Sequence, residues 1–162
     1  MWPAKETGSE PRRCSEDQTK KTLTRKMIFT TTLVELPTSW SNLRGDNFKF
    51  WENEWYEHGT CSYSKLNQTQ YFDLANNIWK GLQLFDIFQK ESISPSTTAK
   101  QKRVDVENAI AKHIGITYKI EFYCFNNSHE LLEIRLCRNH AGNDYTNCVM
   151  LDNCGSSFKW KP

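Results

Sequence analysis

Apolar residues recur three and four positions apart in the middle of the chain, which is the spacing of a helix that buries one face. This pattern predicts an amphipathic helix over residues 71–82 that runs on toward Phe88. It also predicts a shorter helix over residues 106–113, stopped by Gly115 because glycine accepts the left-handed conformation of a helix cap. Residues 28–36 are apolar and rich in threonine, so their pattern alone leaves helix and strand open.

Behind Gly115 the pattern changes to that of strands. Residues 117–125 and 131–137 alternate or run apolar, and a polar turn separates them. Polar stretches that contain proline predict a surface loop over residues 5–26 and a linker over residues 92–102. Helices followed by strands within 162 residues predict a single α+β domain, large enough to bury most of its apolar surface.

The charges of the chain nearly cancel, with 21 lysines and arginines against 19 aspartates and glutamates. This balance excludes the overall basic field that holds duplex nucleic acid, so any nucleic-acid binding has to be local. Aromatic residues make up 13% of the chain, and unpaired bases stack on aromatic faces, although core packing explains any one ring at least as well. The sequence opens without the basic start and apolar run of a signal peptide, and no segment has the length and apolarity of a membrane span.

Cysteine usage points to an oxidising compartment. An even count of cysteines occurs together with two glycosylation sequons, which begin at Asn67 and Asn126. The alternative is that the sequons arose by chance and the thiols stay free. Six cysteines allow fifteen complete pairings, and the absence of a Cys-x-x-Cys spacing argues against a zinc ribbon. The six positions are Cys14, Cys61, Cys124, Cys137, Cys148 and Cys154.

One segment carries most of the functional information, the run Phe50-Trp51-x-x-Glu54-Trp55-x-x-His58-Gly59-Thr60-Cys61. In a helix, Glu54 and His58 lie four positions apart on one face. Such a pair by itself is often only a solvated surface pair, but the flanking tryptophans and cysteine favour a catalytic face. A metalloprotease zinc site is excluded because it needs two histidines on this helix, and positions 53 and 57 are asparagine and glutamate.

This run resembles the second conserved active-site segment of the ribonuclease T2 family, the secreted endoribonucleases that include the S-RNases of plant pistils. The resemblance implies an α+β fold in which helices pack on an antiparallel sheet stabilised by disulfides. It implies metal-independent cleavage of single-stranded RNA through a 2',3'-cyclic phosphate, with no cofactor. It further implies a secreted monomer that binds single-stranded RNA and no membrane.

The resemblance assigns roles to residues of the motif. His58 matches the family's acid or base histidine in this segment, and Glu54 matches the glutamate beside the phosphate. Asn53 stands where many members have an auxiliary histidine, and asparagine can still donate a hydrogen bond. Glu57 stands where the family has lysine. A glutamate there repels a phosphate that a lysine would attract, and two close unit charges interact by roughly 4 kcal/mol at a protein surface. Phe50 matches a base-contacting aromatic residue, and a core role for its ring is equally open.

The same resemblance extends to the amino terminus and the disulfides. Trp2 and Pro3 fit the last two positions of the family segment His-Gly-Leu-Trp-Pro, and Trp2 matches a base-contacting residue. We therefore expect residues 1–162 to form a single ribonuclease T2-like domain that lacks its amino-terminal strand, its first catalytic segment and a preceding signal peptide. A gene model begun at an internal methionine, or a decayed paralogue, would produce such a start. The pairing implied by the resemblance is Cys14–Cys61, Cys124–Cys154 and Cys137–Cys148.

The expected function is that of the family, but we expect this chain as it stands to be impaired or inactive. The first catalytic histidine is absent, and the lysine position is acidic. The remaining histidines have simpler explanations, with His113 packed or partly exposed on a helix, His129 in a surface turn and His140 in a loop. The alternative function is that of a non-catalytic, secreted S-RNase-like recognition protein that binds another protein.

Overall fold

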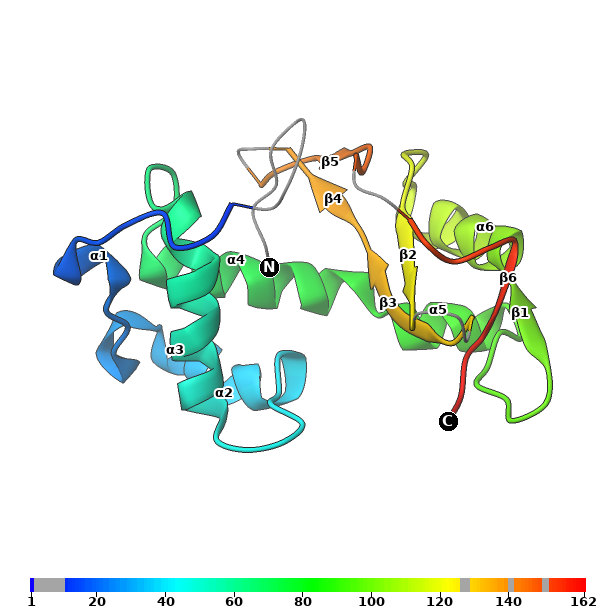
Figure 1. Ribbon diagram of the computed structural model, residues 1–162, viewed down its shortest axis with the longest axis horizontal. Coiled ribbons are helices and arrows are strands. Elements are labelled where there is room, and N and C mark those ends of the chain that lie inside the picture. The colour runs from blue at the N-terminus through cyan, green and yellow to red at the C-terminus, as the bar shows by residue number, and fades with distance from the viewer. Residues whose placement is uncertain (2–10, 126–128, 140–141, 150–151) are drawn as a thin grey trace. The chain divides into compact units, whose positions relative to one another are not determined.

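The computed structural model describes residue 1 and residues 11–125, 129–139, 142–149 and 152–162 (Figure 1). Trp2, Asn126 and His140 lie outside the described residues. The chain divides into two compact units, Met1–Gly81 and Leu82–Pro162. Each unit has its own hydrophobic cluster.

The first unit is helical, and side chains of aspartate begin two of its helices. The Asp17 carboxylate accepts from the Thr19 N–H, and the Asp46 carboxylate accepts from the Lys49 N–H at the start of α3, so each satisfies a backbone donor that the first helical turn leaves open. The segment that the sequence left between helix and strand is helical. The elements are α1 (Gln18–Lys21), η1 (Arg25–Met27), α2 (Thr30–Ser39), α3 (Asn47–Glu57), η2 (Gly59–Ser62) and α4 (Gln68–Leu82), of which α4 ends in the second unit.

Large aromatic rings fill the core of the first unit. Trp51 and Trp55, one turn apart on α3, are buried against Tyr71 and Phe72 of α4. Each tryptophan also satisfies its indole N–H, since Trp51 donates to the Trp40 carbonyl at 2.7 Å and Trp55 donates to a loop carbonyl at 2.8 Å. A buried tryptophan needs such a partner, so these bonds fix the angle at which α3 meets its neighbours.

The predicted surface loop over residues 5–26 contains helical turns and is held in place by hydrogen bonds from α3 and α4. Among its described residues it contains the short helix α1 and part of η1. The buried amide of Gln68, at the start of α4, donates to the carbonyls of Thr19 and Thr22 at 3.2 and 3.0 Å. Trp55 donates to the carbonyl of Lys20, which lies between Thr19 and Thr22 in the sequence. Side chains from α3 and α4 therefore satisfy backbone groups that the loop cannot satisfy itself.

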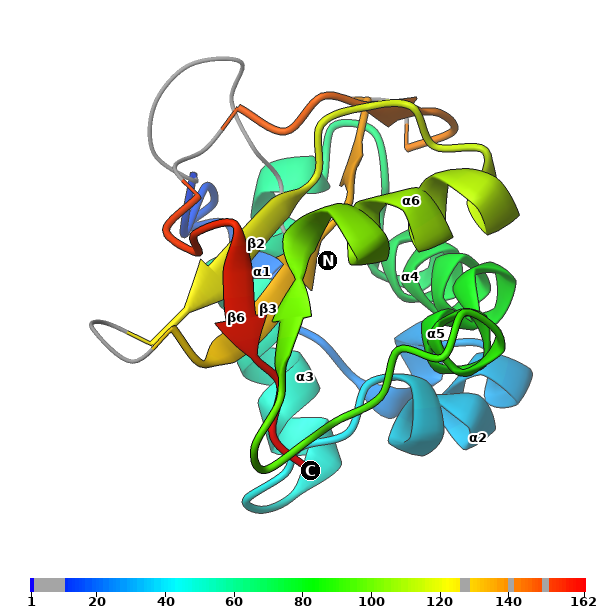
Figure 2. The ribbon, with the colours of Figure 1, turned by 90° about the vertical axis from the view of Figure 1, so that its right-hand side faces the viewer.

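The second unit contains the strands. Among the described residues they form three two-stranded antiparallel sheets, β1 with β6, β2 with β3, and β4 with β5 (Figure 1). The strands β2, β3 and β6 are also labelled in Figure 2. The predicted strands over residues 117–125 and 131–137 correspond to the β2–β3 pair. The elements are α5 (Leu84–Lys90), β1 (Lys100–Lys102), α6 (Arg103–Ile114), β2 (Glu121–Cys124), β3 (Leu131–Arg135), β4 (Cys137–Arg138), β5 (Tyr145–Thr146) and β6 (Ser157–Lys159).

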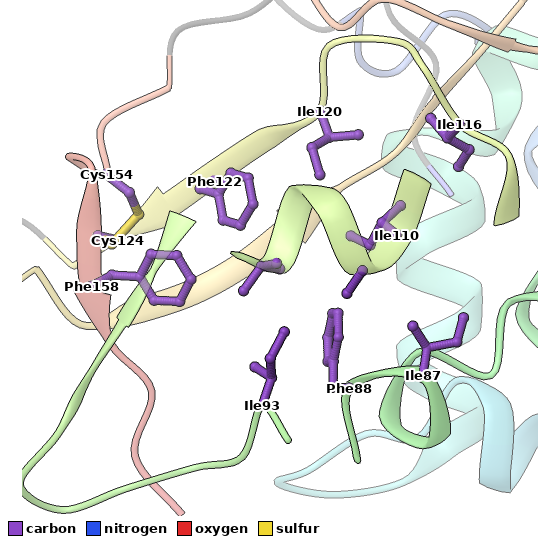
Figure 3. Packing of buried hydrophobic residues seen from close by; sticks show 12 residues of the cluster. Ile87, Phe88, Ile93, Ile110, Ile116, Ile120, Phe122, Cys124, Cys154 and Phe158 are labelled. Carbon is purple, nitrogen blue, oxygen red and sulfur yellow. A yellow bond between two sulfur atoms is a disulfide. The ribbon is translucent and has the colours of Figure 1, made fainter. Parts of the chain in front are cut away.

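The core of the second unit lies between its helices and the β2 and β6 strands (Figure 3). Phe122 of β2 and Phe158 of β6 are fully buried, with ring centroids 5.4 Å apart. Ile110 of α6 and Phe88 of α5 belong to the same cluster. The disulfide Cys124–Cys154 joins the end of β2 to the segment that leads into β6, so it closes this core covalently.

Two predictions about element boundaries differ from the structure. The single helix expected to run from residue 71 toward Phe88 is broken at Gln83, whose φ of 41° separates α4 from α5 (Figure 1). The linker over residues 92–102 ends in β1, because Lys100–Lys102 pair with residues 157–159. By contrast, Gly115 does end α6 with a φ of 74°, so the predicted left-handed stop is confirmed. None of the described helices is long and apolar enough to cross a membrane.

Candidate active site

The end of α3 places Glu54 and His58 together. The helix ends at Glu57, and His58 follows as its carboxyl-terminal cap, with its N–H donating to the Glu54 carbonyl at 3.0 Å. That bond puts His58 one turn after Glu54, so the two side chains leave the helix on the same side. Only 8% of Glu54 and 4% of His58 is exposed, so they are not a solvated surface pair.

Gly59 is required by the packing of this helix end. A Cβ placed on Gly59 would lie 2.8 and 2.9 Å from the Cζ3 and Cδ2 atoms of the Trp55 indole, and closer still to its Cε3 atom. Such distances do not occur between real side chains, so the backbone after His58 lies directly against the ring. Because Trp55 is fully buried and its indole N–H is hydrogen-bonded, the ring is held in place and restricts the backbone at Gly59, the residue after His58.

Thr60 and Cys61 anchor the same segment from the other side. The Thr60 hydroxyl donates to the Tyr56 carbonyl at 3.0 Å and accepts from the Cys14 N–H at 3.2 Å. Cys61 forms a disulfide with Cys14. In the His-Gly-Thr-Cys motif, the three residues that follow His58 therefore hold its backbone in place.

Tyr71 of α4 lies beside Glu54, and the sequence did not identify it as a site residue. Burial raises the pKa of the Tyr71 hydroxyl well above its usual range, and the Glu54 carboxylate raises that pKa further. Its hydroxyl donates to the Met1 carbonyl. Helical spacing marked Tyr71 as a core residue, and only the packing of α3 on α4 shows that it also touches the site.

The predicted base-contacting and auxiliary positions occupy different environments. Asn53 is exposed on α3. Phe50 is half-buried and packs edge-on against Trp40, with ring centroids 6.2 Å apart, so its ring is shared between core and surface. Trp2 lies outside the described residues.

Glu57 does not stand as an isolated negative charge. Arg13, in the amino-terminal loop, donates from Nε and Nη2 to Glu57 Oε1 at 2.8 and 2.6 Å. Hydrogen bonding to Arg13 holds the pKa of the Glu57 carboxyl below its usual range, and the charges of Arg13, Arg12 and His58 act in the same direction. The repulsion expected from an acidic residue at this position is therefore offset by a cation that is distant in sequence.

The structure contains three disulfides, Cys14–Cys61, Cys124–Cys154 and Cys137–Cys148, which is the pairing that the resemblance implies. All six cysteines are bonded, so the alternative of free thiols is wrong. Asn67 is exposed just before α4, and its Oδ1 accepts from the Gln70 N–H. Within the described ranges, no three histidine, cysteine, aspartate or glutamate side chains gather as a metal site would require.

His113 and His129, the other two histidines in the described part of the chain, lie in the second unit. His113 is exposed, and its Nε2 lies 2.6 Å from Glu91 Oε1 on the helix surface, which fits the partly exposed histidine expected there. His129 is exposed in a turn with a φ of 51°. Neither shows the burial that distinguishes His58.

Comparison with known proteins adds to this geometry. The family model described as Ribonuclease T2 family matches residues 1–148. The chain is 30% identical to Ribonuclease S-1 of Pyrus pyrifolia over 98% of this chain and 70% of that protein. It is 29% identical to Ribonuclease 3 of Arabidopsis thaliana over 93% of this chain and 68% of that protein.

A solved structure is also similar. A mutant of RNase MC1 in complex with 5'-GMP superimposes with a TM-score of 0.81 at 25% identity, covering 98% of this chain and 80% of that one. The fold class expected from the sequence, α+β of the ribonuclease T2 type with three disulfides, is thereby confirmed.

Proposed function

Since this chain belongs to the ribonuclease T2 family, we propose that it cleaves single-stranded RNA endonucleolytically through a 2',3'-cyclic phosphate. The observation that carries this proposal is the buried pair of Glu54 and His58 at the rigid end of α3. Three independent features hold His58 there, namely the Trp55 ring under Gly59, the Thr60 hydroxyl and the disulfide to the amino-terminal loop. A proton-transfer group in such a fixed position is pre-organised for catalysis.

The proposed chemistry needs no resident metal or cofactor. A base removes the proton of the ribose 2'-OH, the 2'-oxygen attacks the adjacent phosphorus, and an acid protonates the departing 5'-oxygen. Imidazole suits either proton transfer because it titrates near neutral pH, so His58 serves as the acid or the base. Glu54, one turn before His58, would lie beside the phosphoryl oxygens, where the negative charge that accumulates in the transition state calls for a cation or a protonated carboxyl.

RNA binding in this proposal is local rather than a property of the whole surface. Phe50 leaves part of its ring exposed, and with Trp2 it would stack on bases next to the cleaved bond. The 5'-GMP in the RNase MC1 mutant structure supports a nucleotide ligand for this fold. The family model extends over both compact units, which supports treating residues 1–162 as one ribonuclease T2-like domain.

The disulfides and the exposed sequon support a secretory location. We propose a secreted monomer that carries glycans at Asn67 and Asn126. Asn67 is exposed, as a glycosylated asparagine must be, whereas Asn126 lies outside the described residues. Peptide mapping of protein made in a secreting eukaryotic host would show whether each asparagine carries a glycan.

We propose low activity for residues 1–162 assayed alone. Two proton transfers are needed, yet the motif segment supplies one histidine, His58. The asparagine at 53 and the glutamate at 57 also depart from the family pattern. An added base can substitute for a missing imidazole, so we expect free imidazole to raise the rate.

The decisive experiment is cleavage of single-stranded RNA by the purified, oxidised chain in the presence of EDTA. His58→Gln serves as the matched control, because glutamine preserves polarity at a site that is 4% exposed. We expect slow formation of 2',3'-cyclic phosphate ends, an increase with added imidazole, and neither in His58→Gln. Equal cleavage by the wild type and by a folded His58→Gln variant would refute the proposed role of His58.

The second candidate function is a non-catalytic recognition protein that uses the ribonuclease fold to bind another protein. The acidic residue at position 57 favours this candidate, because loss of a phosphate-binding charge is expected where catalysis is no longer selected. No cleavage above the His58→Gln level, with or without imidazole, would favour recognition over catalysis.

A further inference from the structure

The amino-terminal loop places Arg13 at the end of α3. Two consecutive residues of the loop, Arg13 and Cys14, are each bonded there. The Arg13 N–H donates to the Glu57 carbonyl at 2.9 Å, the Cys14 N–H donates to the Thr60 hydroxyl at 3.2 Å, and Cys14 is disulfide-bonded to Cys61. The position of Arg13 beside the His58 segment is therefore built into the fold.

The Arg13 side chain is aimed at a single carboxylate oxygen. Its Nε and Nη2 atoms both donate to Glu57 Oε1, and its guanidinium carbon lies 5.4 Å from the centre of the Tyr56 ring. Arg13 also has a φ of 51°, in the left-handed region that residues with a Cβ seldom adopt. The backbone bond and the ion pair together hold the residue in this conformation.

Part of the guanidinium remains available for an anion. Its bonds to Glu57 use two of the five N–H groups, and among the described residues the guanidinium makes no other side-chain hydrogen bond. The Arg13 side chain is 59% exposed, whereas the Glu57 side chain is 14% exposed. The carboxylate is thus covered and the cation faces solvent, so an approaching phosphate meets the guanidinium first.

We propose that Arg13 supplies the positive charge of the phosphate site next to His58, and that Glu57 holds Arg13 in position. The proposal rests on the proposed function, since it identifies a further RNA-binding residue of that site. A phosphate at His58 would otherwise face two carboxylates, Glu54 and Glu57. Arginine suits the task because its planar fork can bind a carboxylate with one edge and a phosphate with another.

The test measures binding of a short single-stranded oligonucleotide that cannot be cleaved, with 2'-O-methyl groups on every ribose, by fluorescence anisotropy over a series of salt concentrations. Each phosphate contact contributes about 0.7 to the slope of log affinity against log salt for a single strand. Arg13→Ala should lower that slope by about 0.7 and weaken binding roughly tenfold. Arg13→Lys should keep the slope, because it keeps the charge.

Two comparisons separate a phosphate contact from a structural effect. Lys80→Ala removes a cation that also pairs with a carboxylate in the first unit, Glu35 at 3.0 Å, and should leave the slope unchanged. Glu57→Lys places a cation at position 57 itself. In that background Arg13→Ala should cost less than about twofold in affinity, because the charge no longer depends on Arg13.

The outcomes distinguish this inference from the proposed function. Binding whose salt slope is the same in the wild type and in Arg13→Ala overturns the inference, whatever the cleavage assay shows. Absence of binding by the wild type overturns both. Binding with the expected loss in Arg13→Ala but no cleavage supports the phosphate site and overturns catalysis alone.

Discussion

Replacement of Gly59 by alanine tests how His58 is positioned. The new methyl group would lie within 2.9 Å of three atoms of the Trp55 indole. The ring cannot move away easily, because it is fully buried, donates to the Lys20 carbonyl and packs against Tyr71 at a centroid distance of 5.3 Å. The backbone after α3 must therefore shift, and His58 must shift with it.

The expected cost follows from the tightness of this contact. Overpacking a well-packed core by one methyl group costs about 1 to 3 kcal/mol, and a fixed aromatic neighbour places Gly59→Ala near the upper end. In a domain of this size each kcal/mol lowers the melting temperature by about 2 to 4 °C, so we expect a decrease of about 5 to 10 °C.

Thermal unfolding of the oxidised protein, followed by circular dichroism, measures this decrease. Gly81→Ala is the matched control, since a Cβ at Gly81 in α4 would have no atom within 4 Å. Alanine favours a helix over glycine by up to about 1 kcal/mol, so this control should melt at the wild-type temperature or slightly above it. If both variants melt within about 1 °C of the wild type, the close contact with Trp55 does not exist and our explanation of the motif glycine is wrong.

Three further predictions concern the same region. Replacing both Cys14 and Cys61 by serine removes a disulfide between residues 47 positions apart. In the chain-entropy description this should lower the free energy of unfolding by about 4 kcal/mol. A decrease of less than about 1 kcal/mol, measured by urea unfolding, would contradict this. Trp55→Phe loses an indole hydrogen bond of 2.8 Å and part of a buried ring, so about 2 kcal/mol should be lost in the same assay, and an unchanged midpoint would speak against it. The pKa of Glu57 in the folded protein is below its ordinary 4.5, so its pairing with Arg13 stabilises the fold above about pH 4.5. This stabilisation is lost as the pH falls through the lowered pKa. The difference in free energy of unfolding between the wild type and Glu57→Gln should therefore shrink on acidification, and a difference that grows would refute this prediction.

Local patterns predicted the helices well because a helix is decided by neighbours along the chain. Helical spacing and a stop at Gly115 were sufficient for α6. The break at Gln83 was missed, because nothing local marks a glutamine for a φ of 41°. The strand β1 was missed because Lys100–Lys102 have no strand pattern and pair with residues 157–159, more than fifty positions later.

Patterns along the chain were enough to identify the family, the α+β class and Glu54 and His58 as the residues to examine, because the spacing of the motif is a local property. What surrounds these residues depends on how the chain folds. Glu54 raises the pKa of Tyr71 because the packing of α4 on α3 brings the two residues near each other. Arg13 pairs with Glu57 across 44 positions because a disulfide and backbone bonds bring the loop back to the helix end. The burial and the charge environment of a residue depend on neighbours that are distant in the sequence. The motif alone therefore predicts repulsion at position 57, whereas the folded chain shows that Glu57 is paired with Arg13.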